Sequence, residues 1–278
     1  MEHSEMYQQS KRRFSITSFA LLSGLSVQPA FAHDPVFALG PHVLFKGGIE
    51  IAPEIFIDRA GDKDVNVTGL ELTYGLTGDW SAGINIPYVG KKNNGISENG
   101  QGDLRLFTKY RFWRKDGPGV QQSMTVAVKV KTDTGNSNVS TGTTDTLLGL
   151  AYGYESRKWY RWATLRYLSN GENDAGKRRG DKIFYDLVGG IRMHQTSYLE
   201  PDTVWLLELN GEYSERNELD GIALTNSGGN EVFVSPGIFW TLRNFAVKAG
   251  VQIPVLSQLN ENQQETDYRA RLILEWHL

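Results

Sequence analysis

Ionisable side chains occupy most of the alternate positions from 103 to 111 in the stretch QGDLRLFTKYRFW, residues 101–113, with Phe107 as the exception. Arg105, Lys109 and Arg111 fall on one side of an extended chain, whereas Leu106 and Tyr110 fall on the other. The chemistry that such a row of cations offers is electrostatic, because fixed charges can attract and orient polar solutes without bonding to them. A segment of this kind needs water or counter-charges on one side and an apolar medium on the other.

Charged side chains at equivalent positions of other segments extend this pattern. We predict that twelve of them line a lumen: Glu71, Arg105, Lys109, Arg111, Lys129, Lys131, Asp186, Arg192, Glu208, Glu212, Arg269 and Arg271. The basic side chains of 104–113 and 124–131 would face a mainly acidic group on 183–193 and 205–213, and the field between them would orient a polar solute. The alternative is that these charges pair and fill a narrow lumen.

One short element raises the alternative of a lipid-modifying enzyme. Residues 167–171 read Tyr-Leu-Ser-Asn-Gly and resemble the His-x-Ser-Asn-Gly element of outer-membrane phospholipases, but Tyr167 stands where the catalytic base should be. The histidines that follow residue 32, which are His33, His42, His194 and His277, are expected at the opposite end of the fold. A base on the far side of a membrane cannot take the proton of Ser169, so we predict no catalytic residue and no enzyme.

Metal, nucleotide and nucleic-acid sites lack support in the sequence. His33-Asp34 and the acidic residues of 58–64 have no ligand spacing that selects a metal. No glycine-rich phosphate-binding motif stands between a strand and a helix. The 29 Lys and Arg against 32 Asp and Glu give a net charge of −3, which gives no reason to expect nucleic acid. We therefore predict neither a metal nor a cofactor.

Strands must position the charged residues, because the apolar residues of the chain recur with a period of two. The segments expected as strands are 48–58, 70–76, 80–88, 104–113, 124–131, 146–154, 159–168, 183–193, 205–213, 232–240, 245–253 and 268–278. Most have roughly 8–11 residues, the length that crosses a bilayer when the strand is tilted. Pro53 lies in the segment 48–58 and has no backbone N–H to donate to a neighbouring strand, which predicts a bulge at this position.

The connections between these strands alternate in length. Long polar loops are expected at 59–64, 91–102, 132–144, 169–181, 215–230 and 256–266, and shorter ones at 77–79, 114–122, 155–158, 194–202 and 241–244. A soluble sandwich has no reason to alternate in this way, whereas a barrel with short periplasmic turns does. The sequence thus predicts an all-β, antiparallel up-and-down transmembrane β-barrel of about 12 strands, in which Arg269 and Arg271 would meet Glu50 and Glu54 on closure.

Aromatic residues support the same orientation. The seven tryptophans all fall toward the predicted periplasmic ends of the strands: Trp80, Trp113, Trp159, Trp162, Trp205, Trp240 and Trp276. Several tyrosines fall near the opposite ends. Two belts of amphipathic rings are typical of the two interfaces of a membrane.

The N-terminal residues predict export. Lys11, Arg12 and Arg13 precede the apolar stretch FSITSFALLSGLSV, and Ala30-Phe31-Ala32 follows as a small-x-small cleavage signal. This order is typical of a signal peptide over 1–32. We expect 33–47 to form a periplasmic segment or a plug, and 48–278 to form the barrel in the outer membrane.

Three stretches resemble a known family. They are HDPVFALGPHVLFKGGIE after the cleavage signal, WSAGINIPYV followed by a polar loop, and GQGDLRLFTKYRFW. With them the chain resembles the outer-membrane proteins named for the meta-cleavage (MetA) pathway of phenol degradation. The resemblance implies a barrel that passes small organic molecules, and it carries no defined set of binding residues.

The function expected is the passive passage of small solutes across the outer membrane, with aromatic (phenolic) compounds as candidates. The alternatives are a closed structural or adhesion barrel with a charge-filled lumen and the lipid-modifying enzyme. The partners expected are outer-membrane lipid and lipopolysaccharide, a small-molecule solute and the barrel insertion machinery. The barrel insertion machinery is expected as a partner because the last strand keeps apolar residues at alternate positions up to Trp276 and Leu278, as the final strands of outer-membrane barrels usually do.

Overall fold

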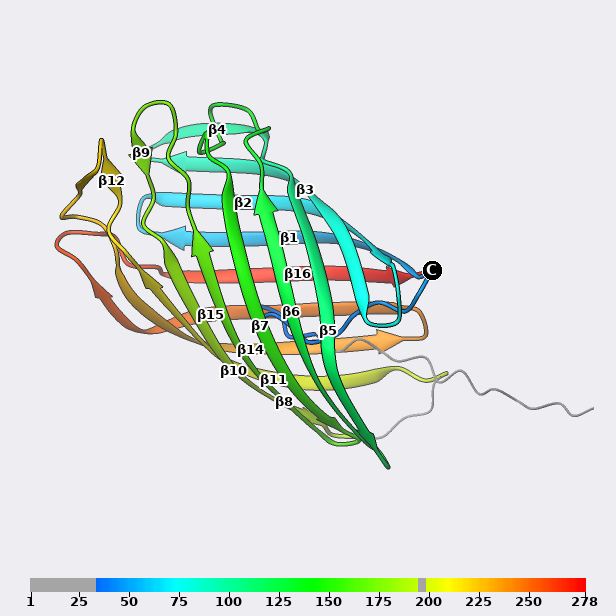
Figure 1. Ribbon diagram of the computed structural model, residues 1–278. Helices are drawn as coiled ribbons and strands as arrows, with labels where there is room; N and C mark the ends of the chain where they lie inside the picture. Colours follow the sequence, from blue (N-terminus) through cyan, green and yellow to red (C-terminus); the bar gives the residue numbers. More distant parts are fainter. Residues whose placement is uncertain (1–33, 195–198) are drawn as a thin grey trace, which may run out of the picture. The chain divides into compact units, whose positions relative to one another are not determined.

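Long antiparallel strands make up most of the protein in a computed structural model that describes residues 34–194 and 199–278 (Figure 1). The predicted signal peptide, 1–32, lies outside the described residues. The twelve long strands within them are β1 Ile49–Ala60, β2 Lys63–Gly75, β3 Trp80–Asn93, β5 Arg105–Gly117, β6 Val120–Lys131, β7 Asp145–Ser156, β8 Trp159–Ser169, β10 Lys182–Arg192, β11 Asp202–Ser214, β14 Gly229–Leu242, β15 Phe245–Leu259 and β16 Tyr268–His277. No helix in these residues is long and apolar enough to cross a membrane.

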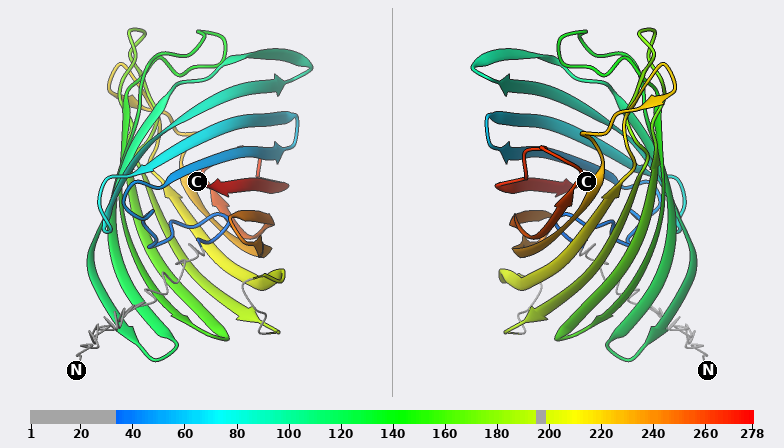
Figure 2. Two further views of the ribbon diagram at one scale, coloured as in Figure 1. Left: turned by 90° about the vertical axis from the view of Figure 1, so that its right-hand side faces the viewer. Right: turned by 90° about the vertical axis from the view of Figure 1, so that its left-hand side faces the viewer.

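The twelve strands close into a ring, as Figure 2 shows. Each pairs antiparallel with its neighbours, and β1 joins β16 through pairs such as Ile51 with Trp276 and Glu54 with Ile273. Closure pairs the backbone polar groups of every strand, which hydrocarbon surroundings demand. The prediction of an up-and-down antiparallel barrel of twelve strands is confirmed.

Side chains alternate between the two faces of the barrel wall, because successive residues of a strand point to opposite sides. On β5, Leu106 and Tyr110 are each 50% exposed on the outer face. On the inner face, Thr125 and Ser235 are fully buried. The apolar outer face and the polar inner face are therefore the reverse of a soluble core, as a membrane-spanning barrel requires.

Two local expectations differ from the structure. Pro53 keeps β1 in unbroken register with β2, so the predicted bulge is absent there, and the register shifts instead between Arg111 and Trp113 on β5 and between Val232 and Phe233 on β14. Trp162 points into the barrel and is 3% exposed, so it does not belong to an outer aromatic belt.

The two ends of the barrel differ in their connections, although the long loop expected at 59–64 is instead a tight turn in which Ala60 pairs with Lys63. At one end the connections are tight, such as those between β5 and β6 and between β14 and β15, and the C-terminal strand ends there. At the other end lie the loop 132–144 and the short strands β4 Ile96–Gln101, β9 Lys177–Arg178, β12 Glu218–Leu219 and β13 Ile222–Ala223. β9, β12 and β13 form a small separate sheet over that end. We call the two ends the turn end and the loop end.

Candidate functional site

The segment 34–48, which precedes β1, lies inside the barrel and forms one compact unit with it (Figure 2). The carboxylate of Glu208 on β11 accepts the backbone N–H groups of Val36 at 2.6 Å, Phe37 at 3.2 Å and Ala38 at 3.0 Å. Glu208 is only 1% exposed. Hydrogen bonds to a charged acceptor are about twice as strong as neutral ones, so this carboxylate is the main polar anchor of the segment.

Other strands hold the same segment from the opposite wall. The guanidinium of Arg271 on β16 donates to the Val36 carbonyl at 2.8 Å, and the Thr125 hydroxyl on β6 donates to the Pro41 carbonyl at 2.5 Å. Lys109 on β5 pairs with Asp34 at 3.0 Å. The segment is therefore tied across the lumen rather than along one wall.

An apolar cluster inside the barrel adds to this anchoring. Val36 and Ala38 pack against inward-facing residues of β8, β10, β11, β14 and β15: Tyr160, Trp162, Val188, Val204, Leu206, Phe239 and Ala246. Burying one side chain of the size of Val36 stabilises a protein by about 1.5–3 kcal/mol. The cluster occupies the lumen on the β8–β15 side, so open space remains mainly on the other side.

Charges at the turn end set the ionisation of the segment. Burial alone would raise the pKa of the Asp34 carboxyl, but Lys109, His42 and Lys248 together hold that pKa well below its usual value. Burial lowers the pKa of His42 from 6.5 to about 4, in spite of the nearby Asp34. His42 is therefore neutral near pH 7, where its Nε2 atom contacts the carboxylate of Glu155.

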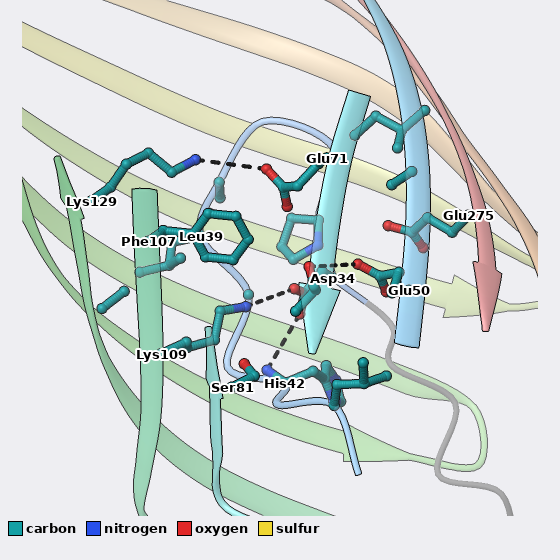
Figure 3. Close-up of a pocket in the computed structure, with 18 of the residues that line it drawn as sticks. Asp34, Leu39, His42, Glu50, Glu71, Ser81, Phe107, Lys109, Lys129 and Glu275 are labelled. Atoms are coloured by element: carbon teal, nitrogen blue, oxygen red, sulfur yellow. Dashed lines mark hydrogen bonds and ion pairs between the residues drawn. The ribbon is translucent and has the colours of Figure 1, made fainter. Parts of the chain in front are cut away.

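Two cavities adjoin within the lumen. The inner cavity has a volume of about 220 Å³ and lies between the segment and the wall that includes Glu71, Phe107, Lys109 and Lys129 (Figure 3). The outer cavity, toward the loop end, has a volume of about 640 Å³. Both are lined by Phe37, Glu54, Lys129, Leu147, Arg166 and Arg271. The two spaces therefore share a boundary, which Lys129 and Phe37 help to form.

Most charged residues of the lumen form ion pairs. The pairs at the outer cavity are Glu54 with Arg271 at 2.7 Å, Asp103 with Lys131 at 3.2 Å, Asp145 with Arg179 at 2.7 Å, Asp186 with Arg166 at 2.8 Å and Glu212 with Arg269 at 3.0 Å. The expected basic wall and acidic wall are thus not separate, because the lumen is narrow enough for opposite charges to meet. Arg271 meets Glu54 as expected, while Arg269 lies next to Asp58 at 3.2 Å and Glu50 contacts His277 at 2.7 Å.

The structure places the twelve predicted lumen residues in four groups. Those at the outer cavity are Arg105, Lys129, Lys131, Asp186, Glu212, Arg269 and Arg271. Glu71 and Lys109 line the inner cavity, together with Lys129 and Arg271. Glu208 lies beneath the segment 34–48. Arg111 and Arg192 line neither cavity, because both lie at the turn end, where Asp79 at 2.8 Å and Asp202 at 2.6 Å pair with them.

Sequence reasoning missed the residues that depend on the inner segment. Tyr160, Trp162, Val204 and Leu206 face inward although they are apolar, and this breaks the simple rule that inward means polar. The uninterrupted apolar run from Val204 to Leu207 was the available signal. Arg166 was also missed, although the alternation from Ala163 to Tyr167 puts it on the inward face with Thr164.

One acidic cluster has the spacing of a metal site. Ligand atoms of Glu50, Glu275 and His277 lie within 4.8 Å of one another. However, the ammonium of Lys248 lies 2.5 Å from Glu275, and His277 contacts Glu50 at 2.7 Å. Lys248 already supplies the positive charge that a cation would bring, so we assign no metal here.

The serine of the enzyme alternative lies far from the described histidines. Ser169 pairs with Thr146 near the start of β7, at the loop end. His42 contacts Glu155, nine residues further along β7, which corresponds to about 30 Å of strand. His277 likewise lies at the turn end, near Glu50. Within residues 34–194 and 199–278, no histidine is therefore placed to activate Ser169.

Comparison with known proteins agrees with this architecture. The COG4313 outer membrane channel from Pseudomonas putida F1 superposes with a TM-score of 0.65 at 16% identity, covering 86% of this chain and 98% of that one. The β domain of the Bordetella autotransporter BrkA superposes with a TM-score of 0.51 at 12% identity, covering 84% of this chain and all of that one. At these identities the likeness shows the fold, an outer-membrane type of barrel.

The sequence itself matches a family. No curated protein matches the chain. A family model with the description "Putative MetA-pathway of phenol degradation" matches residues 57–258, which span the barrel from β1 to β15. This match covers more than half of the chain and includes most of the residues that line the outer cavity. The chain therefore belongs to the family described as the MetA-pathway of phenol degradation.

Proposed function

We propose that the protein is an outer-membrane channel for the passive passage of small solutes, with aromatic (phenolic) compounds among them. The observation that carries this proposal is the pair of adjoining cavities inside the lumen, about 640 Å³ and 220 Å³ in volume. A cavity of about 150 Å³ is enough to hold benzene, so even the inner cavity suits a single-ring compound. The family description and the name of the Pseudomonas channel support the same function.

The lining suits solutes that are partly polar and partly apolar. The outer cavity combines paired charges with the aromatic rings of Phe37, Phe56 and Phe184. Paired charges keep the lumen hydrated without a large net field, and aromatic rings offer a contact surface for apolar bodies. A mixed lining of this kind favours small amphipathic molecules over ions alone.

The segment 34–48 is proposed as a plug that narrows the route. It fills the β8–β15 side of the lumen through the apolar cluster around Val36 and is held by Glu208. A solute would therefore pass on the opposite side, along Phe107 and Lys129. Movement of the segment would widen this route.

Liposome swelling tests passage without assuming a substrate. Vesicles containing the refolded protein should swell in an isotonic solution of a small sugar such as arabinose, and vesicles without protein should not. Swelling should fall as the solute grows from a pentose to a trisaccharide, because the inner cavity is small. Equal rates with and without protein for every solute would refute the channel.

The second candidate is a closed structural or adhesion barrel. The ion pairs across the lumen and the plug favour it, because together they can block passage. A barrel of this kind would give no swelling with any solute, and cell binding would depend on the loops 132–144 and 215–228. Loop-dependent binding without permeation would support this candidate over the channel.

Placement in the outer membrane follows from the outer face. The rings of Trp80, Trp159, Trp205 and Trp276 are exposed there and lie toward the turn end, where they would meet lipid headgroups. Outer-membrane lipid, lipopolysaccharide and the insertion machinery are proposed partners on this basis. Membrane fractions should contain the folded protein, which should migrate differently on a denaturing gel before and after boiling. Recovery in the aqueous fraction with identical migration would count against it.

A further inference from the structure

Arg105 in the outer cavity has no direct ion-pair partner, and the acids Glu54, Glu71 and Asp103 attract it only at longer range. Arg105 lies near the start of β5, faces the lumen and is half-buried. Within residues 34–194 and 199–278 its guanidinium makes no hydrogen bond and no ion pair. Its neighbours across the wall are Asn85 on β3 and Lys131 on β6, and neither is acidic. A half-buried guanidinium without a partner forgoes interactions that a carboxylate would provide.

The charge balance of the cavity explains why Arg105 is left without a partner. Eight basic and five acidic side chains line the outer cavity. The five acids, Glu54, Asp103, Asp145, Asp186 and Glu212, each have another basic partner at 3.2 Å or less. Lys129, the next cation along the wall, reaches only Glu71 at 3.9 Å. The surplus positive charge is therefore carried by Arg105, by Lys129 and by Lys91, whose ammonium donates to the Val139 carbonyl and not to an acid.

An apolar wall adjoins this positive charge on the side of the loop end. Val89 lies four residues beyond Asn85 on β3, so it faces the lumen above Arg105. Val67 pairs with Val89 and with Phe56, and these residues pack together with Val65 and Val139. Phe56, Val67 and Val89 all line the outer cavity. The cavity thus presents a cation at its base and a hydrocarbon surface beside it.

We propose that the outer cavity binds small organic monocarboxylates with an apolar body, the carboxylate on Arg105 and the body against Phe56, Val67 and Val89. The planar guanidinium matches a carboxylate with two parallel hydrogen bonds, whereas a Lys ammonium acts as a point charge. The site deepens the proposed function, since it lies on the route of the proposed channel. It specifies an anionic solute class, which the family description does not name.

Calorimetry on the full-length protein in detergent tests the site with three probes at pH 7. Benzoate carries both features, benzyl alcohol has the ring without the charge, and acetate has the charge with almost no body. Benzoate should bind at least about 10-fold more tightly than either of the others, because each of them loses one set of contacts. Equal binding of benzoate and benzyl alcohol would overturn the role of the charge.

Variants at one position separate a carboxylate site from general attraction. Arg105→Gln should weaken benzoate binding by about 10- to 100-fold and leave benzyl alcohol unchanged. Arg105→Lys should bind benzoate with an affinity between those of the wild type and Arg105→Gln. It keeps the positive charge but loses the planar guanidinium that forms two parallel hydrogen bonds. Arg161→Gln is the matched control, since Arg161 is exposed on the outer face of β8, and it should change nothing. Similar losses in the Arg105 and Arg161 variants would reduce the effect to net charge and overturn the proposal.

Channel recordings distinguish the failure of this site from the failure of the proposed function. If the wild-type barrel conducts KCl, benzoate should block the current at lower concentration than acetate or benzyl alcohol. Conduction with identical block by all three probes would refute the site and leave the channel standing. No conduction, with selective benzoate binding in the calorimeter, would refute the channel and leave the site standing. The wild-type measurements decide the question even if the Arg105 variants fail to fold.

Discussion

Glu208 accepts the backbone N–H of Val36 at 2.6 Å, although 172 residues separate the two in the chain. This contact joins the wall of the barrel to the segment that crosses its lumen. Because the same carboxylate also accepts the N–H groups of Phe37 and Ala38, one side chain fixes three consecutive residues. Glu208 is therefore the anchor that holds the most backbone groups of this segment, beside the contacts of Arg271, Thr125 and Lys109.

Glu208→Gln should loosen the plug. The amide keeps the size of the side chain but loses its charge and one acceptor oxygen, so the N–H groups of 36–38 would be incompletely paired at a cost of about 1–3 kcal/mol. The unfolding midpoint in urea should fall, and conductance should rise. Glu215→Gln, at an exposed loop position, should change neither. An unchanged conductance with a lowered midpoint would show that the anchor stabilises the fold without limiting the route.

The pair of Glu54 and Arg271 should contribute to stability as a unit. The Nη2 atom of Arg271 lies 2.7 Å from Glu54, whose other oxygen accepts a hydrogen bond from Asn85 at 3.0 Å. A double-mutant cycle with Glu54→Gln and Arg271→Gln should give a coupling free energy of about 1–3 kcal/mol. The exposed pair Arg114–Asp116 should give less than about 1 kcal/mol in the same cycle. Equal coupling in both cycles would contradict the buried character of the lumen pair.

Docking of the segment should weaken in mild acid through His42. The titratable and charged groups near its ring are Asp34, Lys109, Arg111, Lys248 and Glu155. Because the pKa of His42 falls from 6.5 in the unfolded chain to about 4 in the fold, the unfolded state binds more protons between these values. Stability should therefore be full above pH 6.5 and should decrease as the pH falls toward 4, by about 3 kcal/mol at most.

The His42→Gln variant isolates this effect from the titration of other groups. Unfolding of the wild type and of the variant in urea at pH 7 and pH 4.5 measures it directly. The wild type should lose more stability over this interval than the variant does. The same loss in both proteins would assign the pH dependence to the carboxylates instead. The depressed pKa of Asp34 adds a further loss only below its usual value of 3.8.

Asp181 should hold the loop between β8 and β10. Its carboxylate accepts the Tyr167 hydroxyl at 2.6 Å, the Asn170 N–H at 2.9 Å and a guanidinium N–H of Arg178 at 2.9 Å. Burial would raise its pKa, but these three donors lower it. Asp181→Asn should let trypsin cleave at Lys177–Arg179 about 10-fold faster, because loss of charge-assisted bonds raises the open population. An unchanged cleavage rate would show that other contacts order the loop.

Much of the barrel was predictable because the face on which a side chain lies depends only on its position within its own strand. The alternation of Arg105 and Lys109 with Leu106 and Tyr110 already separates the lumen from the membrane, and the confirmed strand number follows from repeating that test along the chain. What could not be predicted is what fills the lumen. Strand alternation puts Trp162 on the same inner face as Tyr160, but its apolar partner Val36 is more than a hundred residues away, and no local pattern shows that contact.

The ion pairs show the same limit. The alternation places Arg269 inside, but its partners Glu212 and Asp58 come from strands on different sides of it. Which acid it meets depends on the width and register of the closed barrel, which no single strand encodes. The solitary position of Arg105 is likewise a property of the whole set of pairs.

Single-channel recording of the refolded full-length protein in a planar bilayer tests the central claim most directly. The account predicts discrete conductance steps for the wild type and larger steps for Glu208→Gln, because the route beside the segment exists and widens when its anchor weakens. The absence of steps in both proteins, with folding verified by heat-dependent gel migration, would contradict it.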